Sequence, residues 1–150
     1  MRAVIQRVSM CRLFIDEKEF SNIDRGVLIL LGIEEDDNDQ DLEWLAQKIL
    51  QMRIFGDNEG KMNLSVQDID GHIMVVSQFT LYASVKKGNR PGFTRSAKPE
   101  FANPIYEKFI EYCKNHFSGK ISTGVFGADM KISLLNDGPV TIIIDTKNKE

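Results

Sequence analysis

Two long apolar runs constrain the fold of this chain more than any other feature of its sequence. Residues 26–33 read GVLILLGI, and residues 72–79 read HIMVVSQF. Each run has the length of a strand and is apolar at successive positions, a pattern typical of strands buried on both faces. We therefore expect two central strands that anchor the core.

Two further segments have the periodicity of amphipathic helices. The first has apolar residues at helical spacing after an N-cap at Asn38 or Asp39, and should pack on the sheet; these residues are Leu42, Leu45, Ala46, Ile49 and Leu50. The second has apolar residues at four-residue steps between a start signal at residues 96–99 and a stop at Gly119; they are Phe101, Ile105, Phe109, Cys113 and Phe117.

The remaining segments supply shorter strands. Residues 1–10, 11–16 and 19–24 read as three successive strands of a meander, and residues 51–72 mix a short strand with turns. Residues 120–135 and 140–145 supply the last strands. This order predicts one α+β domain over residues 1–150, with two main helices and a mixed, largely antiparallel sheet that can close into a barrel.

The stretch LLNDGPVTIII, residues 134–144, places turn residues between two apolar strand ends. Pro139 fixes its own φ and lacks a backbone donor, and an X-Pro bond adopts the cis form at a cost of only about 0.5–1 kcal/mol. From these residues alone, the stretch predicts a hairpin turn.

Charge is distributed unevenly along the chain. The net charge of −3 argues against a general nucleic-acid binder. Residues 34–43 are strongly acidic, whereas residues 86–98, the basic loop, carry five cations and no acid. This loop can meet phosphates locally; the alternative is a solvated loop without a ligand.

Composition gives no indication of a membrane or secreted protein. No run approaches the roughly 18 apolar residues of a membrane span, and the first residues lack a signal-peptide core. Cys11 and Cys113 are the only cysteines and have no metal or redox spacing. We expect a cytoplasmic protein in which both cysteines are buried as small apolar residues.

Several familiar motifs are nearly present but fail on a chemical requirement. Residues 56–61, GDNEGK, lack one spacer of a phosphate-binding loop, and Met62 follows where Ser or Thr is needed. Residues 37–41 begin like a calcium loop, but Leu42 replaces the required Gly. His72 and His116 form no ligand pair, and no G-x-S-x-G elbow is present. An enzyme of this sequence would therefore need a labile substrate, or one that supplies its own catalytic group.

The end of the second apolar run is the best candidate for a site. In SQFTLY, residues 77–82, polar Ser77, Gln78 and Thr80 interrupt the apolar pattern where the strand ends. Rigid backbone at a strand end can present N–H groups to a ligand. The alternative is that Thr80 caps a short helical turn while Ser77 and Gln78 satisfy neighbouring backbone.

The whole chain resembles the D-aminoacyl-tRNA deacylases, also called D-tyrosyl-tRNA deacylases. SQFTLY and NDGPVT, residues 136–141, resemble the signature pair of that family. The resemblance extends from MRAVIQRV at the start through KGNRPGF and TGVFGADM to the last strand. It implies a homodimer, without metal or cofactor, that hydrolyses the ester joining a D-amino acid or glycine to the terminal adenosine of tRNA.

The resemblance also assigns a role to the Gly-Pro pair. It implies a cis bond between Gly138 and Pro139, whose carbonyl oxygens reach into the partner subunit's pocket and face the substrate α-carbon. An L-substituent would collide with these oxygens, whereas a D-substituent or a hydrogen would not. Asn136 and Asp137 would shape the turn, and many D-side chains would be tolerated.

The chemistry implied by the resemblance needs no histidine. The backbone N–H groups of Phe79 and Thr80 could stabilise the oxyanion, within the motif that includes Ser77 and Gln78. The 2′-hydroxyl of the terminal ribose would assist attack. The alternative, that Thr80 is a nucleophile, stays open, although no base is visible near it in sequence.

Other positions follow from the same resemblance. Arg7 would orient the Gly-Pro motif, and the alternative is a surface strand residue. Phe126 and Met130 would surround the terminal adenine, and the alternative is core packing. The cations Lys86, Lys87 and Arg90 would lie near acceptor-end phosphates. Gly92 stands where the family pattern has Ser, which loosens this loop.

Three competing functions differ in what they predict. A trans Gly-Pro subgroup of this fold acts on L-amino acids, but it has Pro-Gln-Ala where this chain has Ser-Gln-Phe. An RNA- or nucleotide-binding module would recognise the adenosine without hydrolysing the ester. In a purely structural homodimer, Gly138→Ala would alter stability alone.

Overall fold

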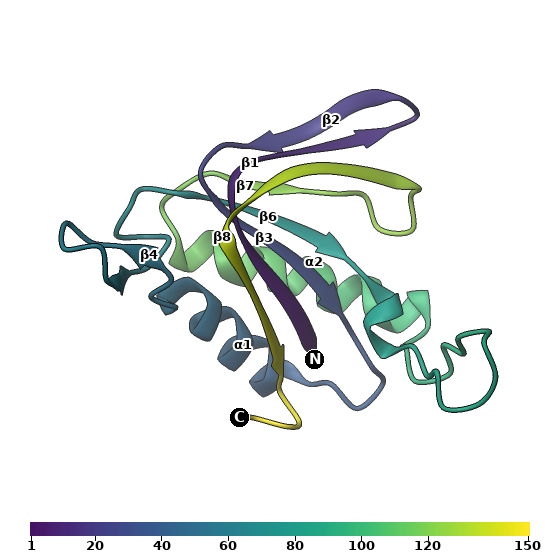
Figure 1. The fold of residues 1–150 in the computed structure, drawn as a ribbon. Coiled ribbons are helices and arrows are strands. Elements are labelled where there is room, and N and C mark those ends of the chain that lie inside the picture. Colours follow the sequence, from purple (N-terminus) through teal and green to yellow (C-terminus); the bar gives the residue numbers. More distant parts are fainter.

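The computed structural model describes residues 1–150 and has the α+β order expected from the sequence (Figure 1). The elements are β1 (Arg2–Ile15), β2 (Lys18–Ile23), β3 (Gly26–Gly32), α1 (Asp39–Gln51), β4 (Phe55–Gly56), β5 (Met62–Leu64), β6 (His72–Ser77), the 3-10 turn η1 (Phe79–Tyr82), α2 (Pro99–His116), β7 (Ile121–Thr123) and β8 (Met130–Asp145). The apolar run at residues 26–33 contains β3 and the run at residues 72–79 contains β6, so both central strands are present as predicted.

One mixed sheet organises the domain. Its strand order is β2-β1-β3-β6-β7, and β8 pairs with the other edge of β1. The β1 pairings are antiparallel, whereas β3 and β6 are parallel because α1 carries the chain back to the same end of the sheet. Hydroxyl groups join β2 to β7: Ser21 donates to the Thr123 carbonyl at 2.9 Å, and Ser122 donates to the Asn22 carbonyl at 2.8 Å. The sheet is therefore nearly closed, which confirms the predicted fold class.

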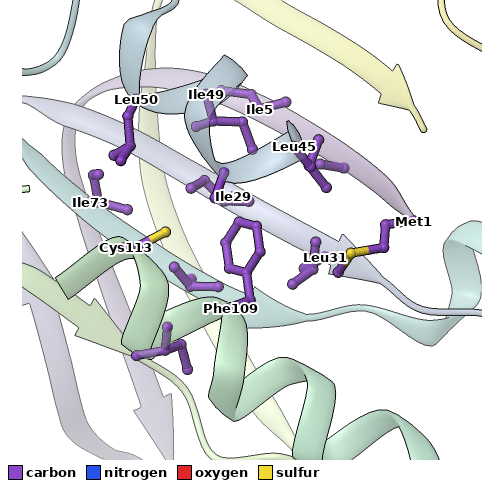
Figure 2. Packing of buried hydrophobic residues seen from close by; sticks show 14 of the residues in the cluster. Met1, Ile5, Ile29, Leu31, Leu45, Ile49, Leu50, Ile73, Phe109 and Cys113 are labelled. Carbon is purple, nitrogen blue, oxygen red and sulfur yellow. The ribbon is translucent and has the colours of Figure 1, made fainter. Parts of the chain in front are cut away.

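Both helices cover the same face of the sheet (Figure 2). Ile29 and Leu31 of β3 lie between Leu45 of α1 and Phe109 of α2, and all four side chains are at most 1% exposed. A second apolar cluster on the opposite face includes Cys11. Cys11 and Cys113 are both free and buried, as predicted. Because apolar side chains pack on both faces of the sheet, β3 and β6 are held in place and their ends have defined positions.

The helix starts agree with the sequence, and the predicted apolar positions of the second helix agree except at its start, since Phe109, Cys113 and Phe117 are buried. Asn38 caps α1, and its side chain accepts hydrogen bonds from the N–H groups of Gln40 and Asp41. In α2 the buried face includes Tyr106 and Ile110, whereas Phe101 is 39% exposed. Steps of four residues drift around a helix of 3.6 residues per turn, so the predicted stripe leaves the core at the start of α2. No helix combines the length and apolar character needed to cross a bilayer.

Two predicted chain breaks are absent. Residues 1–10 and 11–16 do not form separate strands, because β1 runs from Arg2 to Ile15 and pairs with β8 along its length. The hairpin predicted within residues 134–144 is also wrong: these residues lie inside the single strand β8. In both cases the long-range pairing of β1 with β8 continues on either side of the predicted break, so each segment belongs to one strand.

Candidate functional site

The strand β6 ends at Ser77, and the chain then turns sharply into η1. The prediction that this strand continues to residue 79 is wrong, since Gln78 leaves the extended conformation and occupies the N-cap position of η1. Its N–H still donates to the Leu31 carbonyl at 2.7 Å. The first hydrogen bond of the turn runs from the Leu81 N–H to the Gln78 carbonyl at 3.2 Å. The N–H groups of Phe79 and Thr80 precede this bond and remain available to a ligand.

Thr80 lies inside the turn and does not cap it. The side-chain amide of Gln78 donates to the Thr80 hydroxyl oxygen at 2.5 Å. No carboxylate, imidazole or amine shares a hydrogen bond with this hydroxyl, and Thr80 is exposed. In this chain, Thr80 therefore has no side-chain base that would activate it as a nucleophile.

A cavity of about 380 Å³ adjoins this strand end. Its lining includes Ser77, Gln78 and Phe79 from the strand end, Phe93 from the basic loop, and Phe126. Most of its lining residues are apolar, and Phe126 also packs against Tyr106 with a centroid distance of 5.9 Å. Its size and character suit a flat, largely apolar group such as a nucleobase.

Met130 lies beside a different cavity from Phe126. This second cavity, of about 270 Å³, is also lined by Ser77, Gln78 and Phe79. Residues 77–79 thus separate the two cavities, and Gly127 reaches both. Phe126 and Met130 therefore line different cavities, both of which adjoin the same motif. The largest cavity, of about 710 Å³, lies elsewhere, beside Trp44 and the end of β8.

Gly138 and Pro139 lie on a large bulge of β8. Gln6 pairs with Thr141 and Val8 pairs with Asn136, so that residues 137–140 of β8 face the single residue Arg7 of β1. The Gly138-Pro139 peptide bond is cis, and both residues are exposed. A bulge of this size projects its backbone away from the sheet while the strand continues on either side.

Arg7 supports the bulge from the neighbouring strand. Its Nε donates to the Asp137 carbonyl at 3.0 Å, and its Nη1 donates to the Ile54 carbonyl at 2.5 Å. The Asp137 carboxylate lies 3.3 Å from Nε. Only 13% of the Arg7 side chain is exposed, so it is not a surface strand residue. The guanidinium therefore connects the bulge to the loop after α1.

The bulge and the strand-end cavity do not meet within one chain. Neither Gly138 nor Pro139 lines the cavity beside Phe79 or the one beside Met130. The two motifs that carry the family resemblance are thus separated in the protomer.

The basic loop provides cations without internal partners. Lys86, Lys87 and Arg90 are exposed and form no ion pair, whereas Arg95 pairs with Glu34 at 3.1 Å. Three free positive charges on one exposed loop can bind phosphates. No group of three or more His, Cys, Asp or Glu residues is placed to hold a metal ion.

The cysteines are unsuited to catalysis. Burial raises the pKa of the Cys11 thiol to about 11 and that of Cys113 to about 12. Both thiols are therefore protonated at neutral pH, and a thiolate is the form that attacks substrates.

The segment at residues 56–61, which partly matches a phosphate-binding loop, is a turn. The Asp57 carboxylate accepts hydrogen bonds from the N–H groups of Glu59 and Lys61, both at 2.9 Å.

Sequence reasoning missed two residues that contact the strand end. Ser96 donates a hydrogen bond to the Phe79 carbonyl at 2.7 Å, and the Phe93 ring packs edge-on against the Phe79 ring with a centroid distance of 5.1 Å. Both belong to the basic loop: Phe93 ends KGNRPGF, which carries the family resemblance, and Ser96 belongs to the start signal of the second helix, but neither pattern indicates a contact with Phe79. Their contacts depend on how the loop folds back over η1, which no local pattern records.

Comparison with known proteins gives a consistent result along the whole chain. Residues 4–145 match the family described as D-Tyr-tRNA(Tyr) deacylase. A protein from Flavobacterium johnsoniae called D-aminoacyl-tRNA deacylase is 55% identical over 150 residues, which cover 100% of both chains. A protein of the same name from Thermosipho africanus is 50% identical over 147 residues, or 98% of each chain.

Two solved structures share the fold of this chain. The structure called c-Myc DNA Unwinding Element Binding Protein superposes with a TM-score of 0.92 at 40% identity, covering 97% of this chain and 98% of that one. A probable eukaryotic D-amino acid tRNA deacylase superposes with a TM-score of 0.82, covering 95% of this chain and 97% of that one. At 17% identity, this second likeness concerns the fold alone.

Proposed function

The chain belongs to the D-Tyr-tRNA(Tyr) deacylase family, and from this premise we propose that it hydrolyses the ester bond of D-aminoacyl-tRNA. The products are the free D-amino acid and tRNA, and the reaction proofreads the chirality of charged tRNA. One observation carries the proposal: the turn that leaves the backbone N–H groups of Phe79 and Thr80 available begins at an apolar cavity, which Gln78 and Phe79 line. The proposal extends to glycine attached to a non-cognate tRNA.

Ester hydrolysis proceeds through a tetrahedral intermediate that carries negative charge on oxygen. The N–H groups of Phe79 and Thr80 would donate to this oxyanion, since both are held by the start of η1 and neither needs a charged side chain. An aminoacyl ester is already activated, so stabilisation of the oxyanion supplies much of what the reaction requires. Ser77 and Gln78 would fix the strand end that presents these donors.

The base for the attacking water would come from the substrate. Within the protomer no ionisable side chain shares a hydrogen bond with the Thr80 hydroxyl, which supports assistance by the 2′-hydroxyl of the terminal ribose over attack by Thr80. The terminal adenine would enter the cavity beside Phe126, with Met130 on the other side of the motif. Lys86, Lys87 and Arg90 would contact the acceptor-end phosphates.

Backbone carbonyl groups would distinguish D-esters from L-esters. Gly138 and Pro139 of one protomer would enter the partner's pocket, with their carbonyl oxygens directed at the substrate α-carbon, so that L-substituents collide and D-substituents do not. The separation of the bulge from the strand-end cavity within one chain supports this exchange, because only a second protomer can join them. The exposed apolar side chains of Leu135 and Ile143 on β8 are consistent with a homodimer interface.

The proposed substrate also bears on cellular location. Aminoacyl-tRNA is made and used in the cytoplasm, so we place the protein there. The catalytic steps above use backbone groups of the protein and a hydroxyl of the substrate, and they require neither a metal ion nor a cofactor.

A second candidate function is nucleic-acid binding without hydrolysis. It is supported by the cations of the basic loop and by the DNA-binding name of the structure that is 40% identical. Incubation of catalytic amounts of protein with D-tyrosyl-tRNA separates the two. Multiple turnovers of released D-tyrosine are the expected result, whereas stoichiometric binding without release would favour the second candidate.

A further inference from the structure

Ser96 contacts the Phe79–Thr80 peptide unit, although it is 17 positions from Phe79 in sequence. Its hydroxyl donates a hydrogen bond to the Phe79 carbonyl oxygen at 2.7 Å. That carbonyl and the Thr80 N–H belong to one planar peptide unit. Because the plane is rigid, a hydrogen bond that holds the oxygen also sets the direction in which the Thr80 N–H points.

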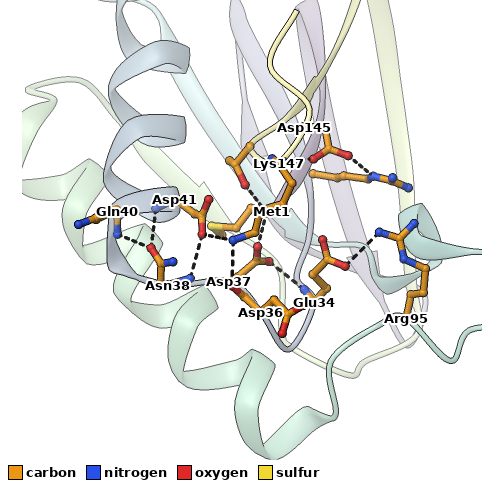
Figure 3. Close-up of polar contacts among 12 residues, drawn as sticks. Met1, Glu34, Asp36, Asp37, Asn38, Gln40, Asp41, Arg95, Asp145 and Lys147 are labelled. Atoms are coloured by element: carbon orange, nitrogen blue, oxygen red, sulfur yellow. Dashed lines mark hydrogen bonds and ion pairs between the residues drawn. The ribbon is translucent and has the colours of Figure 1, made fainter.

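The backbone that presents Ser96 is itself fixed to the sheet. Ser96 forms an antiparallel bridge with Glu34, and the neighbouring Ala97 N–H donates to the Ile33 carbonyl at 3.0 Å. The Arg95 guanidinium pairs with the Glu34 carboxylate at 3.1 Å, a contact drawn in Figure 3. Glu34 lies just beyond β3, which pairs with β6. The hydroxyl is therefore anchored to the strand next to the one that leads into the site.

The same loop holds Phe79 at a second point. The Phe93 ring meets the Phe79 ring at an interplanar angle of 70°, the edge-to-face arrangement that aromatic pairs favour. Phe79 is thus contacted on both its ring and its carbonyl by a segment that also carries Lys86, Lys87 and Arg90. The loop proposed to bind phosphates is physically joined to the group proposed to bind the oxyanion.

We propose that Ser96 is a positioning residue for ester hydrolysis. Its hydroxyl aims the Thr80 N–H at the oxyanion and connects the basic loop to the site. This inference rests on the proposed function, since it assigns a role in that same reaction. It predicts that Ser96 acts on the chemical step and not on substrate affinity, although Ser96 also lies at the edge of the apolar cavity.

The test compares Ser96→Ala with two matched variants in single-turnover deacylation of D-tyrosyl-tRNA over a range of enzyme concentrations. Ser96→Thr keeps the hydroxyl, and Thr94→Ala removes an exposed hydroxyl from the same loop. Loss of a whole oxyanion donor costs about 10²–10³ in rate, and here the donor remains but is less well fixed. We therefore expect Ser96→Ala to lower the saturating rate about tenfold with a nearly unchanged half-saturation concentration.

Ser96→Thr should restore most of the rate, and Thr94→Ala should match wild type. The Thr80 amide resonance, followed by ¹⁵N NMR, should shift in Ser96→Ala but not in Thr94→Ala, which reports the peptide directly without an activity assay. A wild-type rate in Ser96→Ala, or a change in half-saturation alone, would overturn the inference while leaving the proposed function intact. Failure of the wild-type protein to cleave the D-ester would overturn both.

Discussion

Asn136 Nδ2 lies 3.1 Å from the carbonyl oxygen of Val140, so one side-chain amide spans the bulge that carries Gly138 and Pro139. The same nitrogen donates to the Arg7 carbonyl at 3.3 Å. Arg7 donates a hydrogen bond to the Asp137 carbonyl within the bulge, and Asn136 connects the two ends of the bulge. The position of the proposed chiral filter therefore depends on polar side chains that bond to backbone.

Asn136→Asp should reduce the selectivity for D-esters. The substitution keeps the size of the side chain but replaces a donor by an acceptor that faces two carbonyl oxygens. Leaving these acceptors without a partner should also lower the free energy of unfolding by about 1–3 kcal/mol. The ratio of D- to L-tyrosyl-tRNA hydrolysis rates and urea unfolding measure the two effects. Asn115→Asp, on the exposed side of α2, is the control. An unchanged ratio of D- to L-ester hydrolysis in Asn136→Asp would show that the Asn136 hydrogen bonds have no role in selectivity.

Gly138→Ala should abolish most of the D-ester activity. Gly138 has φ of +130°, which side chains rarely adopt, and an added Cβ would lie 2.8 Å from Arg7 Nη2. We expect a loss of stability of about 1–3 kcal/mol together with displacement of the bulge. Gly56→Ala is the control, because its Cβ would meet nothing within 4 Å. Reduced stability with full activity per folded protein would support the purely structural homodimer instead.

Thr80→Ala should retain much of the deacylase activity. The substitution keeps the backbone N–H groups of residues 79 and 80 and removes a hydroxyl that has no side-chain base. A loss of less than about tenfold in the single-turnover rate agrees with oxyanion binding by backbone. If Thr80 were the nucleophile, activity would fall to near the uncatalysed rate and a covalent acyl-enzyme would be trapped by rapid acid quench.

Stability should decline in acid partly through Asp145. Burial alone would raise the pKa of its carboxyl, but the hydrogen bond from Arg2 Nε, at 2.7 Å, contributes to holding the pKa below its usual value. A carboxyl with a lowered folded pKa adds stability above its unfolded pKa of about 3.9, and this stability is lost as pH falls through the folded pKa.

Arg2→Met should therefore lower the unfolding free energy at pH 6 and flatten its dependence on pH below about 4. The change at pH 6 should be at most about 1 kcal/mol, because the Arg2 side chain of this pair is still 29% exposed and solvent screens the interaction. Urea unfolding at several pH values measures it. Lys131→Gln, which breaks the exposed pair with Asp129, is the control and should leave the curve unchanged; identical pH profiles for Arg2→Met and wild type would contradict the assignment.

The parts of the fold that sequence predicts are those set by local burial. The apolar runs of β3 and β6, the Asn38 cap and both buried cysteines follow from patterns within one element. The bulge at residues 137–140 does not, because a Gly-Pro pair in an apolar context serves a hairpin and a bulge equally well. The choice is made by pairing with β1, more than 120 residues earlier in the chain.

The candidate site shows the same division. The strand end can be located from the composition of SQFTLY alone. The burial of Arg7 cannot be predicted in this way, because it depends on the contacts of Arg7 with Ile54 and Asp137, which are distant in sequence. Ser96 belongs to the start signal of the second helix, and nothing in that signal indicates a contact with Phe79. Its significance comes only from the 2.7 Å contact with Phe79.

Chiral selection is tested by the deacylation of matched D- and L-tyrosyl-tRNA by the purified protein in the presence of EDTA. The same tRNA and the same amino acid differ only at the α-carbon, so the ratio of the two rates isolates the chiral filter. Rapid loss of the D-ester, with the L-ester hydrolysed no faster than in buffer, is the predicted result. Equal hydrolysis of both esters, or of neither, would contradict the account.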